Sequence, residues 1–167
     1  MCVDPVPPSD AALERLMQEG VAQILITNRN HTRAANRVAE RTGAQVAIHP
    51  ADAEHARAQG AHIDEALGVG QRVGPFSIVG VPGKSPGEIA LHDATRGILV
   101  VGDAVIGNPP GALSLLLDRV VDDPDQLRNS VRALAALDFD ALIVGDGVSI
   151  LQGAKEQLKK LIATFAT

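Results

Sequence analysis

The stretch VPGKSPG, residues 81–87, separates two segments of strand length, so its glycines and prolines predict a sharp loop between strands. Three comparable loops follow short apolar runs elsewhere: TNRNHTR at 27–33, VGDA at 101–104 and VGDG at 144–147. In α/β layers, chemistry is usually located on loops at the carboxyl ends of strands. These four loops are therefore the expected functional site as well as the best guide to the fold.

The first 60 residues alternate between helix and strand signals. Ser9 is a favourable N-cap and Gly20 a favourable helix end, while Pro50 suits the first turn of a later helix. Short apolar runs between these points have the length of strands. The predicted elements are a helix from Ser9 to Gly20, a strand at 21–26, a helix from about 31 to 41, a strand at 45–48 and a helix from Pro50 to Gly60.

From Gly68 onward the apolar period changes to that of short strands separated by Gly, Pro and Asp turns, which predicts an antiparallel meander. The absence of a repeat, linker or low-complexity segment favours one mixed α/β domain over residues 1–167. The predicted elements are strands at 76–81, 88–92 and 97–101, helices at 113–120 and 124–137, a strand at 141–144, and a C-terminal helix whose apolar stripe runs from Ile150 to Phe165.

Composition excludes several classes of protein. Apolar residues make up 46% of the chain, but it has three Phe and no Trp or Tyr, and its net charge is −5. It therefore lacks both the cationic face and the stacking platforms of a nucleic-acid-binding protein. Cys2 is the only cysteine, which excludes an internal disulfide or a cysteine-based zinc site. The sequence shows neither a membrane-spanning run nor a signal peptide, so we expect no membrane partner and a cytoplasmic protein.

The order and surroundings of the four loops resemble the metallo-β-lactamase superfamily. Its first loop reads T-H-x-H-x-D-H, its second P-G-H-[ST]-P-G, its third G-D and its fourth G-H-G. The resemblance covers nearly the whole chain, with 83–87 and 102–103 as its most specific parts. It implies αβ/βα layers and, in the family, a hydrolase whose loops bind two metal ions.

The departures from the family pattern remove most of the ligands that the resemblance implies. Only Asp103, which bridges the two metals in the family, is retained. A catalytic zinc site normally needs three protein ligands, and the cationic side chains of Lys and Arg offer none. We therefore expect no metal cofactor, the alternative being zinc or another divalent metal. The positions matched to the lost ligands hold Asn28, Asn30, Thr32 and Arg33 in the first loop, Lys84 in the second and Asp146 in the fourth.

The exchanged residues suggest an electrostatic replacement for the metals. If the four loops converge as in the family, Lys84 and Arg33 would pair with Asp103 and Asp146. His31 lies one position off the ligand register, near the start of the expected helix. It could pair with Asp103 or Asp4, act as an acid or base, or be a polar residue satisfied at a helix N-terminus.

Three functions remain open on these grounds. The first is a catalytically degenerate binding or interaction protein, with a small anionic ligand near Arg29, Arg33 and Lys84. The second is a hydrolase with one metal at Asp103, Asp146 and His31, or with acid–base chemistry and no metal. The third is a structural subunit. Because residues 1–4 match the end of a strand that several others precede in the family, we expect an N-terminally truncated sheet and a homodimer or partner chain that completes it.

Overall fold

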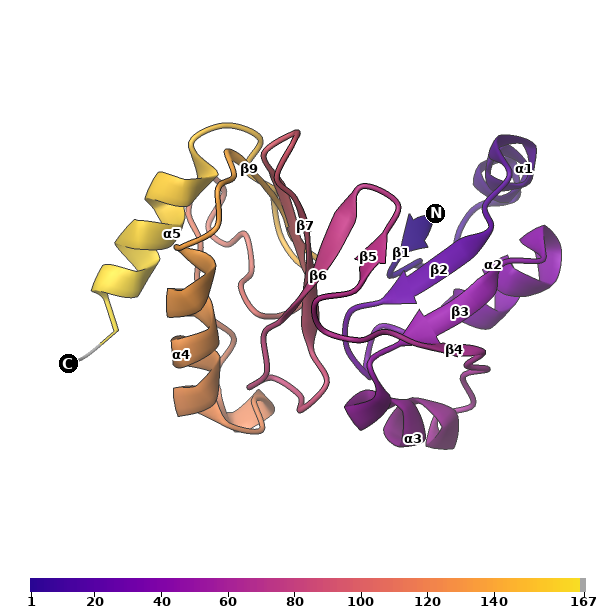
Figure 1. Cartoon of the computed structure of the whole chain (residues 1–167), viewed down its shortest axis with the longest axis horizontal. Coiled ribbons are helices and arrows are strands. Elements are labelled where there is room, and N and C mark those ends of the chain that lie inside the picture. Colours follow the sequence, from indigo (N-terminus) through magenta and orange to yellow (C-terminus); the bar gives the residue numbers. More distant parts are fainter. Residues whose placement is uncertain (166–167) are drawn as a thin grey trace. The chain divides into compact units, whose positions relative to one another are not determined.

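The computed structural model describes residues 1–165, in which the chain forms two compact units, Met1–Gly68 and a second unit that begins at Val69 (Figure 1). Each unit is a single sheet with helices packed on one face. This mixed α/β architecture with two sheets confirms the predicted fold class. No helix in residues 1–165 has the length and apolar character needed to cross a membrane.

The first unit is a parallel sheet in the order β1-β2-β3-β4, with residue partners such as Val3 with Leu25 and Ile26 with Ile48. Its first helix is capped as the sequence predicts, because the Ala12 N–H donates to Ser9 Oγ at 3.2 Å. The elements are β1 (Cys2–Val3), α1 (Asp10–Glu19), β2 (Gln23–Ile26), α2 (Ala35–Thr42), β3 (Gln45–Ile48), α3 (Pro50–Ala58) and β4 (Glu65–Ala66).

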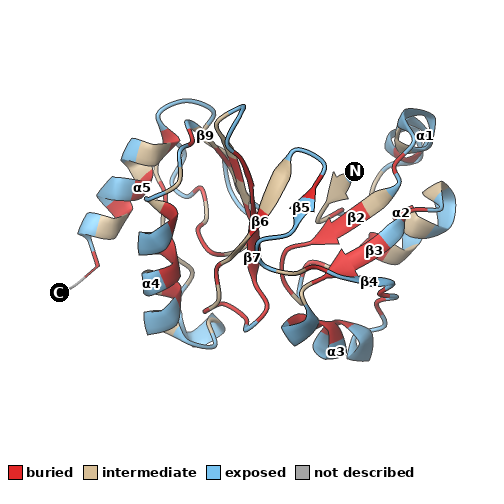
Figure 2. Ribbon diagram, in the orientation of Figure 1, coloured by how far each residue is buried: buried red, intermediate tan, exposed pale blue. Residues whose placement is uncertain are grey.

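Alternate residues of the central strands build the core of this unit. Ile24 and Ile26 of β2 point to the face on which the three helices pack, and Val46 and Ile48 of β3 do the same. Each of these four side chains is fully buried (Figure 2). The helices contribute Leu13, Val38 and Ala56 to the same cluster.

The second unit is the predicted meander, with β9 added in parallel beside β8. Helices α4 and α5 pack on one face of this sheet, where Leu127, Val131 and Leu158 meet Leu99 and Leu142. Its elements are β5 (Arg72–Val73), β6 (Phe76–Gly80), β7 (Ile89–Asp93), β8 (Ile98–Val101), the 3-10 turn η1 (Asp118–Val120), α4 (Pro124–Leu134), β9 (Ala141–Ile143) and α5 (Ala154–Ala163).

The turn between β7 and β8 is fixed by the buried carboxylate of Asp93. This carboxylate accepts hydrogen bonds from the backbone N–H groups of Thr95 and Arg96, at 3.0 and 3.1 Å. Arg96 Nη1 adds an ion pair at 2.8 Å, and that hydrogen bond lowers the pKa of Asp93. The turn sets the strand register in which Asp93 lies opposite Ile98.

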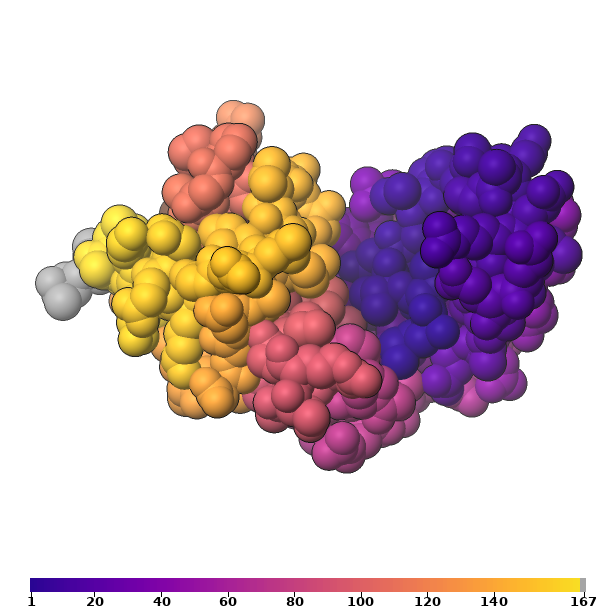
Figure 3. All heavy atoms as spheres, turned by 90° about the horizontal axis from the view of Figure 1, so that it is seen from above, coloured from indigo at the N-terminus to yellow at the C-terminus, as the bar shows by residue number. Residues whose placement is uncertain are grey.

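Three predicted helix boundaries are wrong, in each case because tertiary contacts override the local apolar pattern. Residues 113–117 are not helical, since Ser114 pairs with Ile106 through two backbone hydrogen bonds. Figure 3 shows the salmon segment that contains this pairing standing out from the surface of the second unit. Helix α2 begins at Ala35 rather than near residue 31, and α5 begins at Ala154 because Ile150 bridges to Leu142.

Candidate functional site

The loops of the first unit gather at one edge of its sheet because β1, β2 and β3 run parallel. The carboxyl ends of these strands place Asp4, the loop 27–33 and the start of α3 beside one another. This is the position at which α/β sheets usually carry their functional residues.

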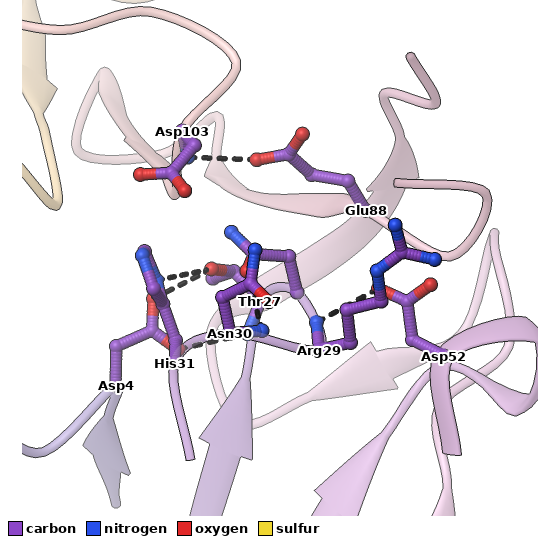
Figure 4. Close-up of polar contacts among 9 residues, drawn as sticks. Asp4, Thr27, Arg29, Asn30, His31, Asp52, Glu88 and Asp103 are labelled. Atoms are coloured by element: carbon purple, nitrogen blue, oxygen red, sulfur yellow. Dashed lines mark hydrogen bonds and ion pairs between the residues drawn. The ribbon is translucent and has the colours of Figure 1, made fainter. Parts of the chain in front are cut away.

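Asp4 organises this edge with three hydrogen bonds to its carboxylate (Figure 4). The backbone N–H of Thr27 donates to Oδ1 at 2.8 Å, and the Thr27 hydroxyl donates to Oδ2 at 2.6 Å. His31 Nδ1 lies 2.8 Å from Oδ2 and 3.2 Å from Thr27 Oγ1. Because an ionised carboxylate only accepts, His31 carries its hydrogen on Nδ1. The pairing of His31 with Asp4, one of the two predicted, is therefore confirmed.

The rest of the first loop is held by its own polar groups. Asn28 is fully buried, and its Oδ1 accepts the N–H of Asn30 at 2.9 Å, which is an Asx turn. The N–H of Arg29 donates to Oδ2 of Asp52 at 2.9 Å, and Asp52 is itself fully buried in the first turn of α3. Because of this turn, α2 begins only at Ala35, and His31 lies four residues before it in the loop.

In the second unit, three loops lie together at one end of the sheet. Glu88, at the end of the loop 81–88, accepts the backbone N–H of Asp103 on Oε1 at 2.7 Å. The Gly145 N–H donates to the carbonyl of Gly102 at 3.3 Å. The Gly107 N–H donates to the carbonyl of Asp146 at 3.0 Å, so the loop of the third motif pairs with that of the fourth.

The loop 81–88 is also bound tightly to α4. The N–H of Asp123 donates to the Gly83 carbonyl at 2.9 Å, and the hydroxyl of Ser130 donates to the Pro82 carbonyl at 2.7 Å. Gly83 has a φ of +142°, and a Cβ there would lie 2.4 Å from the backbone of Leu127. The backbone approaches the helix so closely that this position requires glycine.

The ion pairs predicted for Lys84 are not formed. Lys84 is 7% exposed, yet it takes part in none of the ion pairs found among the described residues of the second unit. The Asp146 side chain is exposed, and its loop is held by the hydrogen bond from the Gly107 N–H to the Asp146 carbonyl. At Asp103 the backbone N–H donates to the Glu88 carboxylate. Arg33 is exposed and lies, like Thr32, between the first loop and α2 in the other unit.

Two buried carboxylates in these loops, Asp52 and Glu88, had not been singled out from the sequence. Each accepts a backbone N–H of a predicted loop residue, Arg29 or Asp103. The sequence offers only a charged residue next to an apolar run as a signal, and this does not identify the donor that the carboxylate meets.

The histidines and carboxylates of the described residues lie apart from one another or serve local contacts. Within residues 1–165 no group of three or more His, Cys, Asp and Glu side chains has an arrangement that could hold a metal ion. His49 caps α3 by accepting the Ala51 N–H at 3.3 Å, and His62 pairs with Asp64 at 3.0 Å. These histidines serve local structure.

Comparison with known proteins identifies the family. The sequence profile described as "Metallo-beta-lactamase superfamily" matches residues 1–165. A hydroxyacylglutathione hydrolase from Cereibacter sphaeroides (strain ATCC 17025 / ATH 2.4.3) is 32% identical over 146 residues, which are 83% of this chain and 53% of that protein. The chain thus spans about half the length of this curated relative.

Solved structures show the same fold. TTHA1623 in a di-iron-bound form is 25% identical with a TM-score of 0.74, over 93% of this chain and 86% of that one. The B3 metallo-β-lactamase BLEG-1 is 20% identical with a TM-score of 0.73, over 92% and 83%. With the profile match over nearly every residue, these likenesses establish that the chain belongs to the metallo-β-lactamase superfamily.

Proposed function

We propose that this chain is a metallo-β-lactamase-fold protein without metal-dependent hydrolase activity, which acts as a binding or interaction protein. The observation that carries the proposal is the donor set at the loops. A catalytic metal needs about three His, Cys or carboxylate ligands held in one place, and residues 1–165 contain no such group.

In this chain, residues at the positions of the family's metal ligands are of types that serve the loop structure or carry a positive charge. Asn28 uses its amide oxygen in the turn to Asn30, which makes it a structural element of the loop. Lys84 brings a cation to the position where the family pattern has a histidine ligand. TTHA1623 has a di-iron-bound form, but the side chains described in residues 1–165 do not offer the ligands that a two-iron site needs.

Metal analysis of tag-free protein purified without chelator tests this proposal. We expect substoichiometric zinc, iron and manganese. We also expect no hydrolysis of a hydroxyacylglutathione thioester or a β-lactam above the buffer rate, with or without added zinc. The hydroxyacylglutathione hydrolase relative, purified in parallel, is the positive control. One bound metal per chain together with turnover that a chelator abolishes would overturn the proposal.

A second candidate, a metal-free hydrolase, is favoured by the Asp4–His31 pair. The Asp4 carboxylate, 2.8 Å from Nδ1, orients the imidazole of His31, and an oriented imidazole is a common general acid or base. This candidate predicts turnover that resists chelators and is lost in His31→Asn. The control is His62→Asn, since the side chain of His62 is 76% exposed and forms no part of the loops.

We further propose a homodimer in which a second copy pairs along β1. Strand β1 is the edge of the first sheet, and exposed backbone at an edge invites pairing. The Asp4 N–H donates to Leu25 of β2, so the N–H of Val3 points the opposite way. Light scattering should give a dimer that Val3→Pro dissociates, whereas a monomer at high concentration would contradict this proposal.

A further inference from the structure

A pocket of about 460 Å³ lies in the first unit, between α2, the start of β3 and the segment before β4. This volume is within the range of sites that hold small molecules. Ala39 and Ala44 contribute apolar surface, and their small side chains leave the space open. Because Gln45 begins β3 and Asp64 directly precedes β4, the pocket lies at the amino ends of these strands, whereas the loop 27–33 follows a carboxyl end.

The walls of the pocket are held in place by the protein itself. Oδ1 of Asn36 on α2 accepts the His62 N–H at 2.9 Å, and its Nδ2 donates to the Gly60 carbonyl at 2.8 Å. The Asp64 carboxylate accepts the Val46 N–H on Oδ2 at 2.8 Å, and its Oδ1 lies 3.0 Å from Nε2 of His62. These contacts join the segment before β4 to α2 and β3, so a ligand that enters has little to order.

The charge around the pocket favours a cation. Glu40 and Asp64 both line it, whereas no lysine or arginine does so among the described residues. Arg37 and Arg41 of α2 contact α1 instead, through Asp10 and Met17. The carboxyl end of α2 also borders the pocket, and the end of a helix that carries its free carbonyl groups has a partial negative charge.

Glu40 is the lining carboxylate that remains available to a ligand. The two oxygens of Asp64 already meet Val46 and His62. Glu40 forms no ion pair and no side-chain hydrogen bond with any residue in the range 1–165. It follows Asn36 by four residues, so both lie on the face of α2 that borders the pocket.

We propose that this pocket binds a small organic cation, with an ammonium or guanidinium group on a short apolar body. The cationic group donates charge-assisted hydrogen bonds to the Glu40 carboxylate. The apolar body lies against Ala39 and Ala44, which removes apolar surface of both from water. The site goes beyond the proposed function and does not rest on it, since it shares no residue with Asp4 or the loop 27–33.

NMR titration of isotope-labelled protein with butylammonium, butylguanidinium and butyrate, at equal ionic strength, tests the site. The three probes share one apolar body and differ in their charged group. We expect the amide signals of Ala39, Gly43 and Gln45 to shift with at least one cation and not with butyrate. The cation with the lower dissociation constant identifies the group that the pocket prefers.

Glu40→Gln should weaken binding of the cation about 5-fold or more, because it removes the charge that the ligand meets. Glu14→Gln is the matched control and should bind as wild type, since Glu14 is exposed on α1 and does not line the pocket. Ala39→Leu keeps every charge but fills the apolar part, so it should also weaken binding.

Three results would overturn the proposal. The first is that neither cation shifts the amide signals of the pocket. The second is that butyrate binds as tightly as the cations do. The third is that Glu40→Gln or Ala39→Leu binds as tightly as wild type. Glu40 is exposed, so its substitution leaves the fold intact and keeps the test decisive even if Ala39→Leu does not fold.

Discussion

His31 donates its Nδ1–H to Oδ2 of Asp4 at 2.8 Å, and both side chains are nearly buried, with exposures of 7% and 11%. Asp4 itself has a φ of +47°, a left-handed conformation that Asp and Asn adopt more readily than most residues. The carboxylate thus ties the end of β1 to the loop after β2 through three hydrogen bonds. These contacts fix the position of the first loop of the family pattern relative to β1.

Asp4→Asn is expected to destabilise the chain by about 3 kcal/mol, because it replaces a nearly buried carboxylate that accepts three hydrogen bonds. Asn tolerates the left-handed backbone, so the change acts on the hydrogen bonds and the charge alone. The free energy of unfolding in urea measures it.

The control for this change is Asp10→Asn. The Asp10 carboxylate pairs with Arg37 at 3.0 Å but is 90% exposed, so its loss should cost less than about 1 kcal/mol. Equal effects of the two substitutions would show that the Asp4 cluster contributes no more than a surface ion pair.

Asp93 should make the second unit less stable in acid. The hydrogen bond from Arg96 lowers the pKa of Asp93 in the folded chain below its ordinary value of 3.8. The unfolded chain therefore binds the proton more readily. The stabilising contribution is complete above the unfolded-state pKa and is lost as pH falls through the folded-state pKa. Urea unfolding from pH 6 down to about pH 3 should show this loss in wild type.

The variant Asp93→Asn should flatten that dependence, since it removes the group that titrates. Asp138→Asn serves as the control, because the Asp138 side chain is 97% exposed on the same unit. If Asp93→Asn retained the full acid sensitivity of the wild type, another group would be responsible.

Cys2 should react slowly with thiol reagents. Burial, the largest cause, raises the pKa of the Cys2 thiol, so a smaller share is thiolate at pH 8 than in a free cysteine. The rate with a chromogenic disulfide reagent should be well below that of an exposed cysteine. Ala58→Cys, on an exposed position of α3 in a Cys2→Ser background, provides that reference. Equal rates would contradict the prediction.

The positions of the loops could be predicted from the sequence because strong local signals mark them. Ser9 and Gly20 bound α1, and Asp123 caps α4 by accepting the N–H of Gln126 at 2.9 Å. Apolar runs between such signals place the strands β2, β3, β6, β7 and β8. The loops lie between these elements, and their order along the chain is what revealed the resemblance to the family.

The contacts within the loops could not be predicted because they depend on backbone groups far apart in the chain. Asp52 and Arg29 are 23 residues apart, and Glu88 and Asp103 are 15 apart. The expected pairing of Lys84 with Asp103 considered side chains alone, whereas Glu88 takes the backbone N–H of Asp103. Likewise the apolar run at 113–117 suggests a helix until its pairing with Ile106 is known.

Gly83→Ala should disrupt the second unit. Both the φ of +142° and the distance of 2.4 Å from an added Cβ to the Leu127 backbone oppose a side chain at this position. Because helix backbone cannot move aside as a flexible side chain can, we expect a loss of about 4 kcal/mol or more.

Gly111→Ala is the control that separates the clash of an added Cβ from the strain of a positive φ. Gly111 also has a positive φ, +84°, but an added Cβ there meets nothing within 4 Å. Its substitution should cost only the left-handed strain, about 1–2 kcal/mol. Urea unfolding of both variants measures the difference. If Gly83→Ala is no worse than Gly111→Ala, the loop 81–88 can move away from α4, and the conclusion that this position requires glycine is refuted.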